Sequence, residues 1–206
     1  METENKDTEA LILQAAEELF LERGFTKTTT ALIAQRAGCN HALVHYYYRT
    51  KDKLFNRIFE EKARIILNNF WHAGKDGDTF EEKLTAKIRA HFDFLKENAK
   101  LLRFLYNEIS TNPARIESVF EIAKKMKPGV AIEQTKRELE EEIRSGRIRP
   151  ISIENLLLTM ISLNISPFLL QPIFLSVFKN MPEQVNQFLE QRREENVRII
   201  LARLKP

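Results

Sequence analysis

Cysteine, glycine and proline are scarce in this sequence. Cys39 is the only cysteine among 206 residues, so no disulfide can form within the chain, and this suits a reducing compartment. With 6 Gly and 7 Pro, few residues interrupt helices, and alternating runs of β-branched residues are rare. The first residues, METENKDTEA, are polar and acidic, unlike a secretory signal. The composition therefore predicts an all-α chain located in the cytoplasm.

Charged residues are missing altogether from residues 155–178. The length of this stretch would allow a membrane span, but Pro167 and Pro172 interrupt it, and three amides within it would lack partners in lipid. No second span and no pattern of flanking positive charge accompany it. An apolar surface of this size is too large to stay exposed on a soluble monomer. We therefore expect no membrane association, and a homodimer that forms through residues 152–204 as a helical bundle.

The N-terminal region has few basic residues in its first part and few acidic residues in its second. Residues 1–22 carry one lysine and seven acidic residues, whereas residues 23–57 carry seven basic residues and one aspartate. A compact basic segment favours a polyanionic partner. Ordinary surface charge is the alternative, and charge alone does not decide between them.

Helix start and stop signals divide the first part of the chain. Apolar residues at helical spacing predict a helix over residues 8–23 that stops at Gly24. Phe25 follows the stop, where it can fold back on Phe20. Thr29 can cap a second helix through ALIAQRA, and Gly38 can end it.

A third and a fourth helix follow closely. Asn40 can cap a helix from His41 to about Tyr47, and Thr50 can cap a long helix from Lys51 to about Ala73. Two short helices joined by a tight turn that contains glycine form a helix-turn-helix. After a loop at residues 74–78, helical stretches are expected near residues 79–97, 99–111, 114–126, 129–145 and 182–204.

The segment GFTKTTTALIAQRAGCNHALVHYYYRTKDKLF, residues 24–55, resembles the N-terminal DNA-binding domain of TetR/AcrR-type transcriptional regulators. The order and spacing of the set carry the resemblance. Its members are Gly24-Phe25, Thr28-Thr29, Ile33-Ala34, Ala37-Gly38, Ala42, Tyr46-Tyr47-Tyr48, Lys51 and Leu54. The chain departs from the usual pattern at Leu32, Cys39, Ala42, His45 and Tyr48.

The resemblance implies a fold and a function. The fold would be an N-terminal three-helix DNA-binding domain, residues 1–55, followed by a larger helical domain, residues 56–206, for effector binding and dimerisation. The function would be that of a repressor that binds a palindromic operator in double-stranded DNA as a homodimer. A small-molecule effector, which the sequence does not identify, would release the repressor.

The third helix would then be the recognition helix. At 100° per residue, His41, Ala42, His45 and Tyr46 share one face, with Leu43 and Val44 behind them and Tyr47 at the edge. The front face is polar and free of carboxylates, as a helix entering a major groove must be. The predicted DNA-binding residues are Thr28, Thr29, Asn40, His41, Ala42, His45, Tyr46, Tyr47 and Lys51.

Other interpretations of this segment are weaker. Cys39, His41 and His45 have a spacing that could bind zinc, but no fourth ligand lies near. Part of the tyrosine cluster could instead be a helix-packing edge, and we expect this of Tyr48. No metal and no cofactor are expected.

The rest of the chain is rich in large apolar residues, and the resemblance implies an effector cavity there. Plain core packing is the alternative for any single aromatic residue. The candidate effector-binding residues are Trp71, His91, Tyr106 and Asn107. No phosphate-binding loop, nucleophile motif or closely spaced acid pair is present, so we expect no enzyme. Two other functions remain open: an activator without an effector, and a helical ligand-binding or enzyme domain with a vestigial helix-turn-helix.

Overall fold

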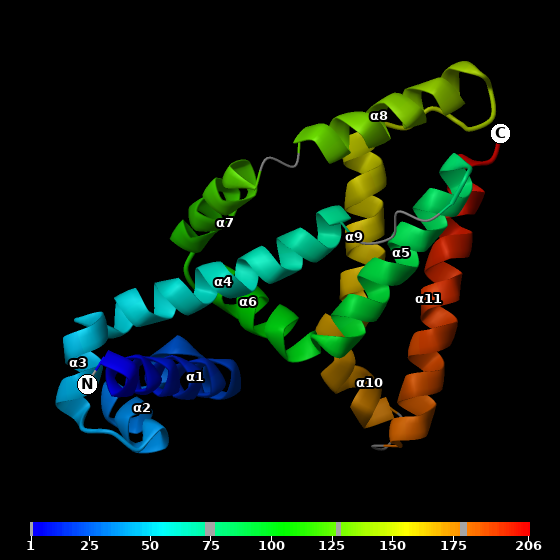
Figure 1. Cartoon of the computed structure of the whole chain (residues 1–206). Helices are drawn as coiled ribbons and strands as arrows, with labels where there is room; N and C mark the ends of the chain where they lie inside the picture. Colours follow the sequence, from blue (N-terminus) through cyan, green and yellow to red (C-terminus); the bar gives the residue numbers. More distant parts are fainter. Residues whose placement is uncertain (1, 73–76, 127–128, 178–180) are drawn as a thin grey trace. The chain divides into compact units, whose positions relative to one another are not determined.

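The computed structural model describes residues 2–72, 77–126, 129–177 and 181–206, and these residues form helices joined by short connections (Figure 1). The predicted all-α class is confirmed, since no strand occurs in these ranges. The chain divides into two compact units. Unit 1 contains residues 1–66 and 103–125, and unit 2 contains residues 67–102 and 126–206. The predicted functional division after residue 55 stays a prediction.

Unit 1 begins with the helices of the expected helix-turn-helix. These are α1 (Glu2–Lys27), α2 (Thr30–Ala37), α3 (His41–Tyr48) and α4 (Lys51–His72). Gly24 breaks the helical geometry within α1, with φ 74° and ψ 174°, and Phe25 stacks on Phe20 at a centroid distance of 6.2 Å. Both features match the predicted stop. The predicted end of the fourth helix at Ala73, and loop residues 74–76, lie outside the described residues.

The core of unit 1 is a cluster of phenyl rings. Phe55 contacts Phe20 and Phe25, each at a centroid distance of 4.9 Å. Phe104 lies 5.7 Å from Phe55 and 6.4 Å from Phe59. Because Phe104 belongs to α6 (Ala99–Thr111), this later helix is part of the same core as the helix-turn-helix. Its successor, α7 (Ala114–Lys125), also belongs to unit 1.

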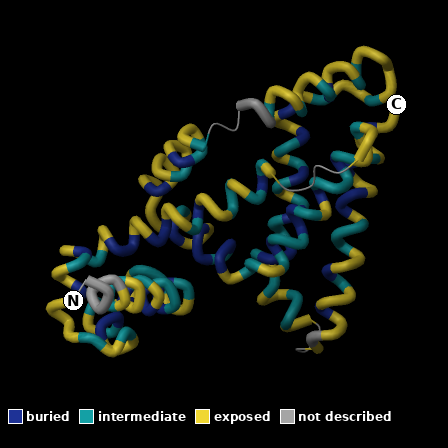
Figure 2. Tube along the Cα trace, in the orientation of Figure 1, coloured by how far each residue is buried: buried dark blue, intermediate teal, exposed yellow. Residues whose placement is uncertain are grey.

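Unit 2 packs α5, α9 and α11 against one another around an apolar core (Figure 2). Its helices are α5 (Phe80–Glu97), α8 (Gly129–Arg144), α9 (Ile153–Leu169), α10 (Gln171–Val177) and α11 (Pro182–Leu204), together with the end of α4. No single helix in the described ranges is long and apolar enough to cross a membrane. Together α9 and α10 pass that test of length and composition, as a pair bent by 51°. Phe178, at the end of the predicted uncharged stretch, lies outside the described residues.

Pro167 does not interrupt the helix as predicted, because α9 continues through it. A proline lacks the N–H that would bond the carbonyl of residue 163. The Leu163 carbonyl instead accepts from Asn196 Nδ2 at 3.0 Å and from Ser166 Oγ at 3.3 Å. Side chains therefore replace the missing backbone hydrogen bond, and the chain bends only after Leu169.

Candidate nucleic-acid interface

The helix-turn-helix is built by the predicted capping residues. Thr29 Oγ1 accepts from the backbone N–H of Leu32 at 3.2 Å, and Asn40 Oδ1 accepts from that of Ala42 at 2.9 Å. Gly38 ends α2 in the left-handed conformation, with φ 66°. The predicted caps and stop are confirmed. Both capping side chains are exposed, so Thr29 and Asn40 flank the surface of α3.

The recognition helix has one buried row and a broad exposed face. Val44 and Tyr48, one turn apart, are buried, which confirms Tyr48 as a packing residue. The exposed residues are His41, Ala42, Leu43, His45 and Tyr46. Leu43, expected on the back face, is exposed because a helix of 8 residues is held by this single row. No carboxylate lies on the helix.

The polar side-chain atoms of two predicted contact residues form hydrogen bonds within unit 1. Thr28 is fully buried, and its hydroxyl lies 2.9 Å from the Gly24 carbonyl and 3.2 Å from that of Leu19. This burial gives Thr28 a structural role in place of the predicted phosphate contact. The half-buried Lys51 donates from Nζ to the carbonyls of Phe25 and Thr28 at 3.1 and 3.0 Å. Lys51 therefore ties the start of α4 to the end of α1.

The tyrosine hydroxyls at the end of α3 differ in environment. Tyr48 donates to Glu9 Oε1 at 3.3 Å, and burial raises the pKa of Tyr48 to about 12. Tyr47 is half-buried at the edge of the helix, as predicted, and its ring meets that of the exposed Tyr46 at 5.2 Å. Desolvation, followed by the nearby Tyr46, raises the pKa of Tyr47. The hydroxyls of Tyr47 and Tyr48 are therefore neutral hydrogen-bonding groups at pH 7.

The acidic helix α1 neutralises part of the basic segment. Arg36 pairs with Glu18 at 3.2 Å, and Lys62 pairs with Glu17 at 2.6 Å. Much of the charge contrast noticed in the sequence is therefore satisfied within unit 1. Arg49 and Lys53, at the junction of α3 and α4, are exposed and form no ion pair within the described ranges.

Sequence reasoning missed Thr30 and Arg49. Thr30 Oγ1 lies 2.8 Å from His41 Nε2, which links α2 to the recognition helix. Arg49 ends α3 with φ 61°. A positive φ at a residue other than glycine gives no signal in a single sequence, because glycine is the residue that marks such positions. The contact of Thr30 depends on how α2 and α3 pack.

The described residues contain no cluster of side chains that could bind a metal ion. No group of three or more His, Cys, Asp or Glu side chains is placed to hold an ion there. His41 and His45 meet edge to face at 4.6 Å. Burial raises the pKa of the Cys39 thiol, and this disfavours the thiolate that a metal would need.

The four predicted effector residues lie in different units. Trp71 and His91 belong to unit 2, where both contact Phe70 at 4.7 and 5.3 Å. Tyr106 and Asn107 are exposed on α6 in unit 1. The structure thus brings Trp71 and His91 together around Phe70.

The hydrogen-bonding network of His91 consists of neutral amides. Asn164 Nδ2 donates to His91 Nδ1 at 3.2 Å and to the Ile88 carbonyl at 2.9 Å. Asn196 Nδ2 donates to Asn164 Oδ1 at 2.9 Å. Burial, with a smaller effect of Lys87, lowers the pKa of His91 to about 4, so this imidazole is neutral at pH 7. Trp71 Nε1 and Asn196 Oδ1 are buried without a partner in the described ranges.

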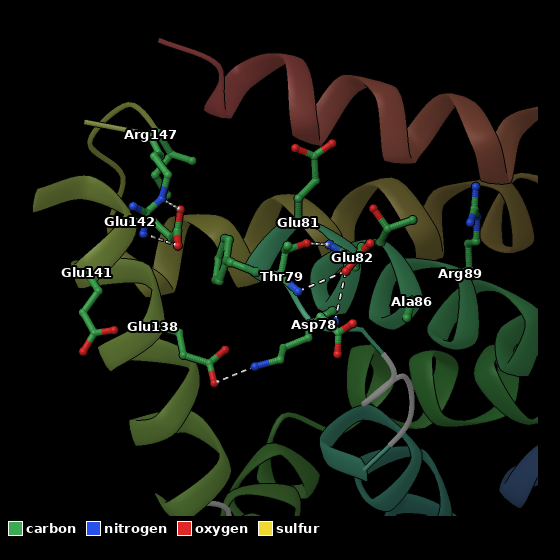
Figure 3. Close-up of a pocket in the computed structure, with 14 residues that line it drawn as sticks. Asp78, Thr79, Glu81, Glu82, Ala86, Arg89, Glu138, Glu141, Glu142 and Arg147 are labelled. Carbon is green, nitrogen blue, oxygen red and sulfur yellow. Dashed lines mark hydrogen bonds and ion pairs between the residues drawn. The ribbon is translucent and has the colours of Figure 1, made fainter. Parts of the chain in front are cut away.

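A groove of about 1160 Å³ also lies in unit 2, between the start of α5 and the end of α8 (Figure 3). Lys83 pairs with Glu138 at 3.2 Å, and Arg147 pairs with Glu142 at 2.7 Å on its wall. None of the predicted effector residues lines it. Ion pairs that are already satisfied do not identify a ligand, so this groove is not assigned as the effector site.

Comparisons with known proteins identify relatives of the chain. Residues 12–58 match the family model described as bacterial regulatory proteins, TetR family. An uncharacterized HTH-type transcriptional regulator, YhgD of Bacillus subtilis, is 24% identical over 160 residues, which cover 78% of this chain and 82% of YhgD. The HTH-type transcriptional repressor Rv3405c of Mycobacterium tuberculosis is 36% identical over 84 residues, 41% of this chain and 44% of the repressor.

A solved structure supports the fold over nearly the full length. A bacterial regulatory protein in the TetR family from Rhodococcus superposes with a TM-score of 0.65 at 22% identity, covering 94% of this chain and 96% of that one. At this identity the likeness concerns the fold. Together with the match over residues 12–58, it extends the likeness from the helix-turn-helix to the helices that follow.

Proposed function

We propose that this chain, which belongs to the TetR family of bacterial regulatory proteins, acts in the cytoplasm as a homodimeric repressor. It is a DNA-binding transcriptional regulator with a helix-turn-helix. In our proposal, two copies bind a palindromic operator in double-stranded DNA, with their recognition helices about one helical turn apart. A small-molecule effector then lowers the affinity for DNA.

The exposed face of α3 carries the proposal for DNA. Tyr46 is 68% exposed, and His41, Ala42 and His45 share its surface without any carboxylate. Hydrogen-bonding groups on such a face can reach base edges in the major groove. We propose that these four side chains contact base edges. Thr29, Asn40 and Tyr47 would contact the phosphates. Thr28 and Lys51 then act as positioning residues.

The charge of Lys53 gives a direct test of DNA contact. Binding to duplex DNA, followed by fluorescence anisotropy, should weaken as salt rises, because bound lysines release counterions. Lys53→Ala should reduce the slope of log affinity against log salt by about one for each chain bound. Lys136→Ala, an exposed lysine on α8, is the matched control and should leave the slope unchanged. A chain without salt-dependent binding would contradict the proposal and favour a vestigial helix-turn-helix.

Exposed apolar residues on α9 and α11 support a homodimer through residues 152–204. Leu158 is 62% exposed within a helix that has only one charged residue, and Ile199 is exposed on α11. Exposed apolar side chains that gather on neighbouring helices favour a partner surface. A second copy would meet these helices with the same face, as twofold symmetry requires.

Two variants with the same initial exposure test the dimer. Leu158 and Phe120 are both 62% exposed, on α9 in unit 2 and on α7 in unit 1. Leu158→Lys should yield monomers in sedimentation analysis, because it places a charge within the proposed interface. Phe120→Lys should remain dimeric. The opposite pattern would locate the interface on α7. Leu163 is a poorer probe, because it packs against the core of unit 2.

The surroundings of Phe70 support an effector site in unit 2. Trp71 and His91 contact this ring, and Trp71 Nε1 and Asn196 Oδ1 have no partner in the described ranges. A mostly apolar lining with a few polar groups is typical of ligand sites. We propose that the effector is largely apolar, with a polar group for these atoms. Tyr106 and Asn107, on α6 in unit 1, remain separate candidates.

Trp71 is the only tryptophan in the chain, so its fluorescence reports on this site. A compound that is an effector should change Trp71 emission and release DNA over the same concentration range. The control variant Trp71→Phe should lose the signal. A ligand that releases DNA without changing the emission would place the site elsewhere. An activator without an effector would instead show no ligand-dependent release.

A further inference from the structure

The turn between α3 and α4 has an unusual backbone at Arg49. This residue has φ 61° and ψ −51°, and the N–H of Thr50 donates to the Tyr48 carbonyl at 2.6 Å across it. A hydrogen bond between residues two apart, around a residue with these angles, defines the rare γ-turn with positive φ. In the described ranges, Arg49 is the only residue other than glycine that has a positive φ. Such strained geometry is concentrated at functional sites.

The carbonyl of Arg49 contacts the recognition helix. His45 Nδ1 lies 3.2 Å from this oxygen. A carbonyl oxygen can only accept a hydrogen bond, so Nδ1 must carry the proton. A neutral imidazole has a single N–H, and its Nε2 is therefore an acceptor. His45 is exposed and forms no other hydrogen bond in the described ranges.

His41, one turn earlier, differs in this respect. Its Nε2 already lies 2.8 Å from Thr30 Oγ1. The hydroxyl of Thr30 can donate or accept, so this contact does not determine the tautomer of His41. Of the two exposed histidines on α3, only His45 has a hydrogen-bonding polarity that is fixed by the backbone. The fixed proton on Nδ1 determines which base edges His45 can pair with.

We propose that His45 accepts a hydrogen bond from the exocyclic amino group of an adenine or a cytosine in each half-site. Adenine N6 and cytosine N4 are the donors that base pairs present in the major groove. The guanine and thymine edges present acceptors, which cannot pair with a lone pair on Nε2. Arg49 is then a positioning residue that acts through its carbonyl. This inference rests on the proposed DNA binding by α3.

The first measurement concerns the free protein. Two-bond ¹H–¹⁵N correlation spectra of the full chain at pH 8, labelled on its 4 histidines, distinguish the two neutral tautomers. His45→Asn assigns the His45 signals by removing them. We expect the tautomer with the proton on Nδ1. A proton on Nε2 would overturn the inference whatever the protein binds.

The second measurement is a selection from randomised duplex DNA at pH 8. The chain should enrich one base pair at a position of each half-site that depends on His45, and replacing the adenine or cytosine of that pair by an analogue without the exocyclic amino group should remove the preference. His45→Asn keeps an N–H for the Arg49 carbonyl but has no atom in the place of Nε2. It should equalise the bases at that position and lower affinity for the preferred site on the order of fivefold, the value of one neutral hydrogen bond.

Arg49→Gly is the matched control for the turn. Glycine adopts a positive φ without strain and keeps the carbonyl, so the preference for the same base pair should persist. A preference that survives removal of that amino group, or a selected site that His45→Asn leaves unchanged, would overturn the inference while DNA binding stands. Failure of the chain to select any sequence would overturn both the inference and the proposed function.

Discussion

The two units bury polar groups in different ways. In unit 1, Glu108 and Arg115 form a buried ion pair at 3.5 Å, with the guanidinium 4.1 Å from the centroid of Phe55. In unit 2, the buried polar residues around His91 are neutral amides and an imidazole. Charge is therefore buried beside the DNA-binding helices, and neutral hydrogen bonds lie within the core of the larger helical unit.

The ion pair in unit 1 holds a specific turn. Glu108 Oε1 accepts from the backbone N–H of Phe25 at 3.1 Å, directly after the break at Gly24. Arg115 donates to Asn56 Oδ1 on α4 at 2.9 Å. These contacts join α6 and α7 to α1 and α4. Residues beyond the helix-turn-helix thus help to position it. The same helix α6 also brings Phe104 into the phenyl core.

The neutral cluster of unit 2 compensates for a proline. Asn196 bonds the Leu163 carbonyl that Pro167 leaves free, and it also bonds Asn164. Asn164 connects in turn to His91 and α5. Three helices therefore meet through groups that need no counter-charge. The stability of unit 1 should therefore be sensitive to the loss of a charge, and that of unit 2 to protonation.

Removal of one partner of the ion pair should have the largest effect. Arg115→Leu leaves the Glu108 carboxylate buried without its cation, so unit 1 should lose about 3–5 kcal/mol in free energy of unfolding. Urea unfolding measures this loss. The double variant with Glu108→Leu should recover most of it, because two apolar groups replace the pair. A loss below about 1 kcal/mol would show that the pair behaves like an exposed one.

Acid should destabilise unit 2 through His91. Its pKa is about 4 in the folded chain and about 6.5 in the unfolded chain, so the unfolded state binds the proton first. The stabilisation is complete above about pH 6.5 and is lost as the pH falls to 4, by about 3 kcal/mol. Unfolding followed by Trp71 fluorescence measures it. His91→Leu should flatten this dependence, and an unchanged slope would assign it to other groups.

Loss of the central amide should have a smaller effect. Asn164→Ala leaves His91 Nδ1 and one donor of Asn196 with fewer partners, so we expect a loss of about 2–3 kcal/mol. Asn155→Ala, on the exposed part of the same helix, is the matched control and should change little. Calorimetry measures both variants. Equal losses in free energy of unfolding would mean that the buried hydrogen bonds of Asn164 contribute no more than an exposed amide does.

An exposed pair should have the smallest effect. Glu121 and Lys124 pair at 2.8 Å on α7, but both are exposed. Surface pairs of this kind contribute little, so Glu121→Gln should leave the thermal midpoint of unit 1 unchanged. A clear decrease would weaken the contrast between the exposed pair and the buried one.

Local signals made the helix-turn-helix predictable. Thr29, Gly38 and Asn40 determine helix ends through bonds to residues only a few positions away, so a single sequence contains them. The burial of Thr28, by contrast, depends on how the end of α1 packs against its neighbours.

The buried ion pair and the γ-turn could not be predicted from the sequence. Glu108 and Arg115 lie on helices whose charged residues would ordinarily face solvent, and their burial depends on the distant rings of Phe25 and Phe55. Arg49 occupies a conformation that its residue type disfavours. The contacts that bring α6 and α7 into unit 1 therefore require the fold.

Selection from randomised duplex DNA with the full chain is the most direct test of DNA recognition by a dimer. We expect an enriched inverted repeat whose half-sites lie about one helical turn, roughly 10 base pairs, apart. His41→Ala should relax the preference at one position of each half-site. A single unpaired half-site would contradict the dimer, and the absence of any enriched sequence from a folded, dimeric chain would contradict recognition of DNA by α3.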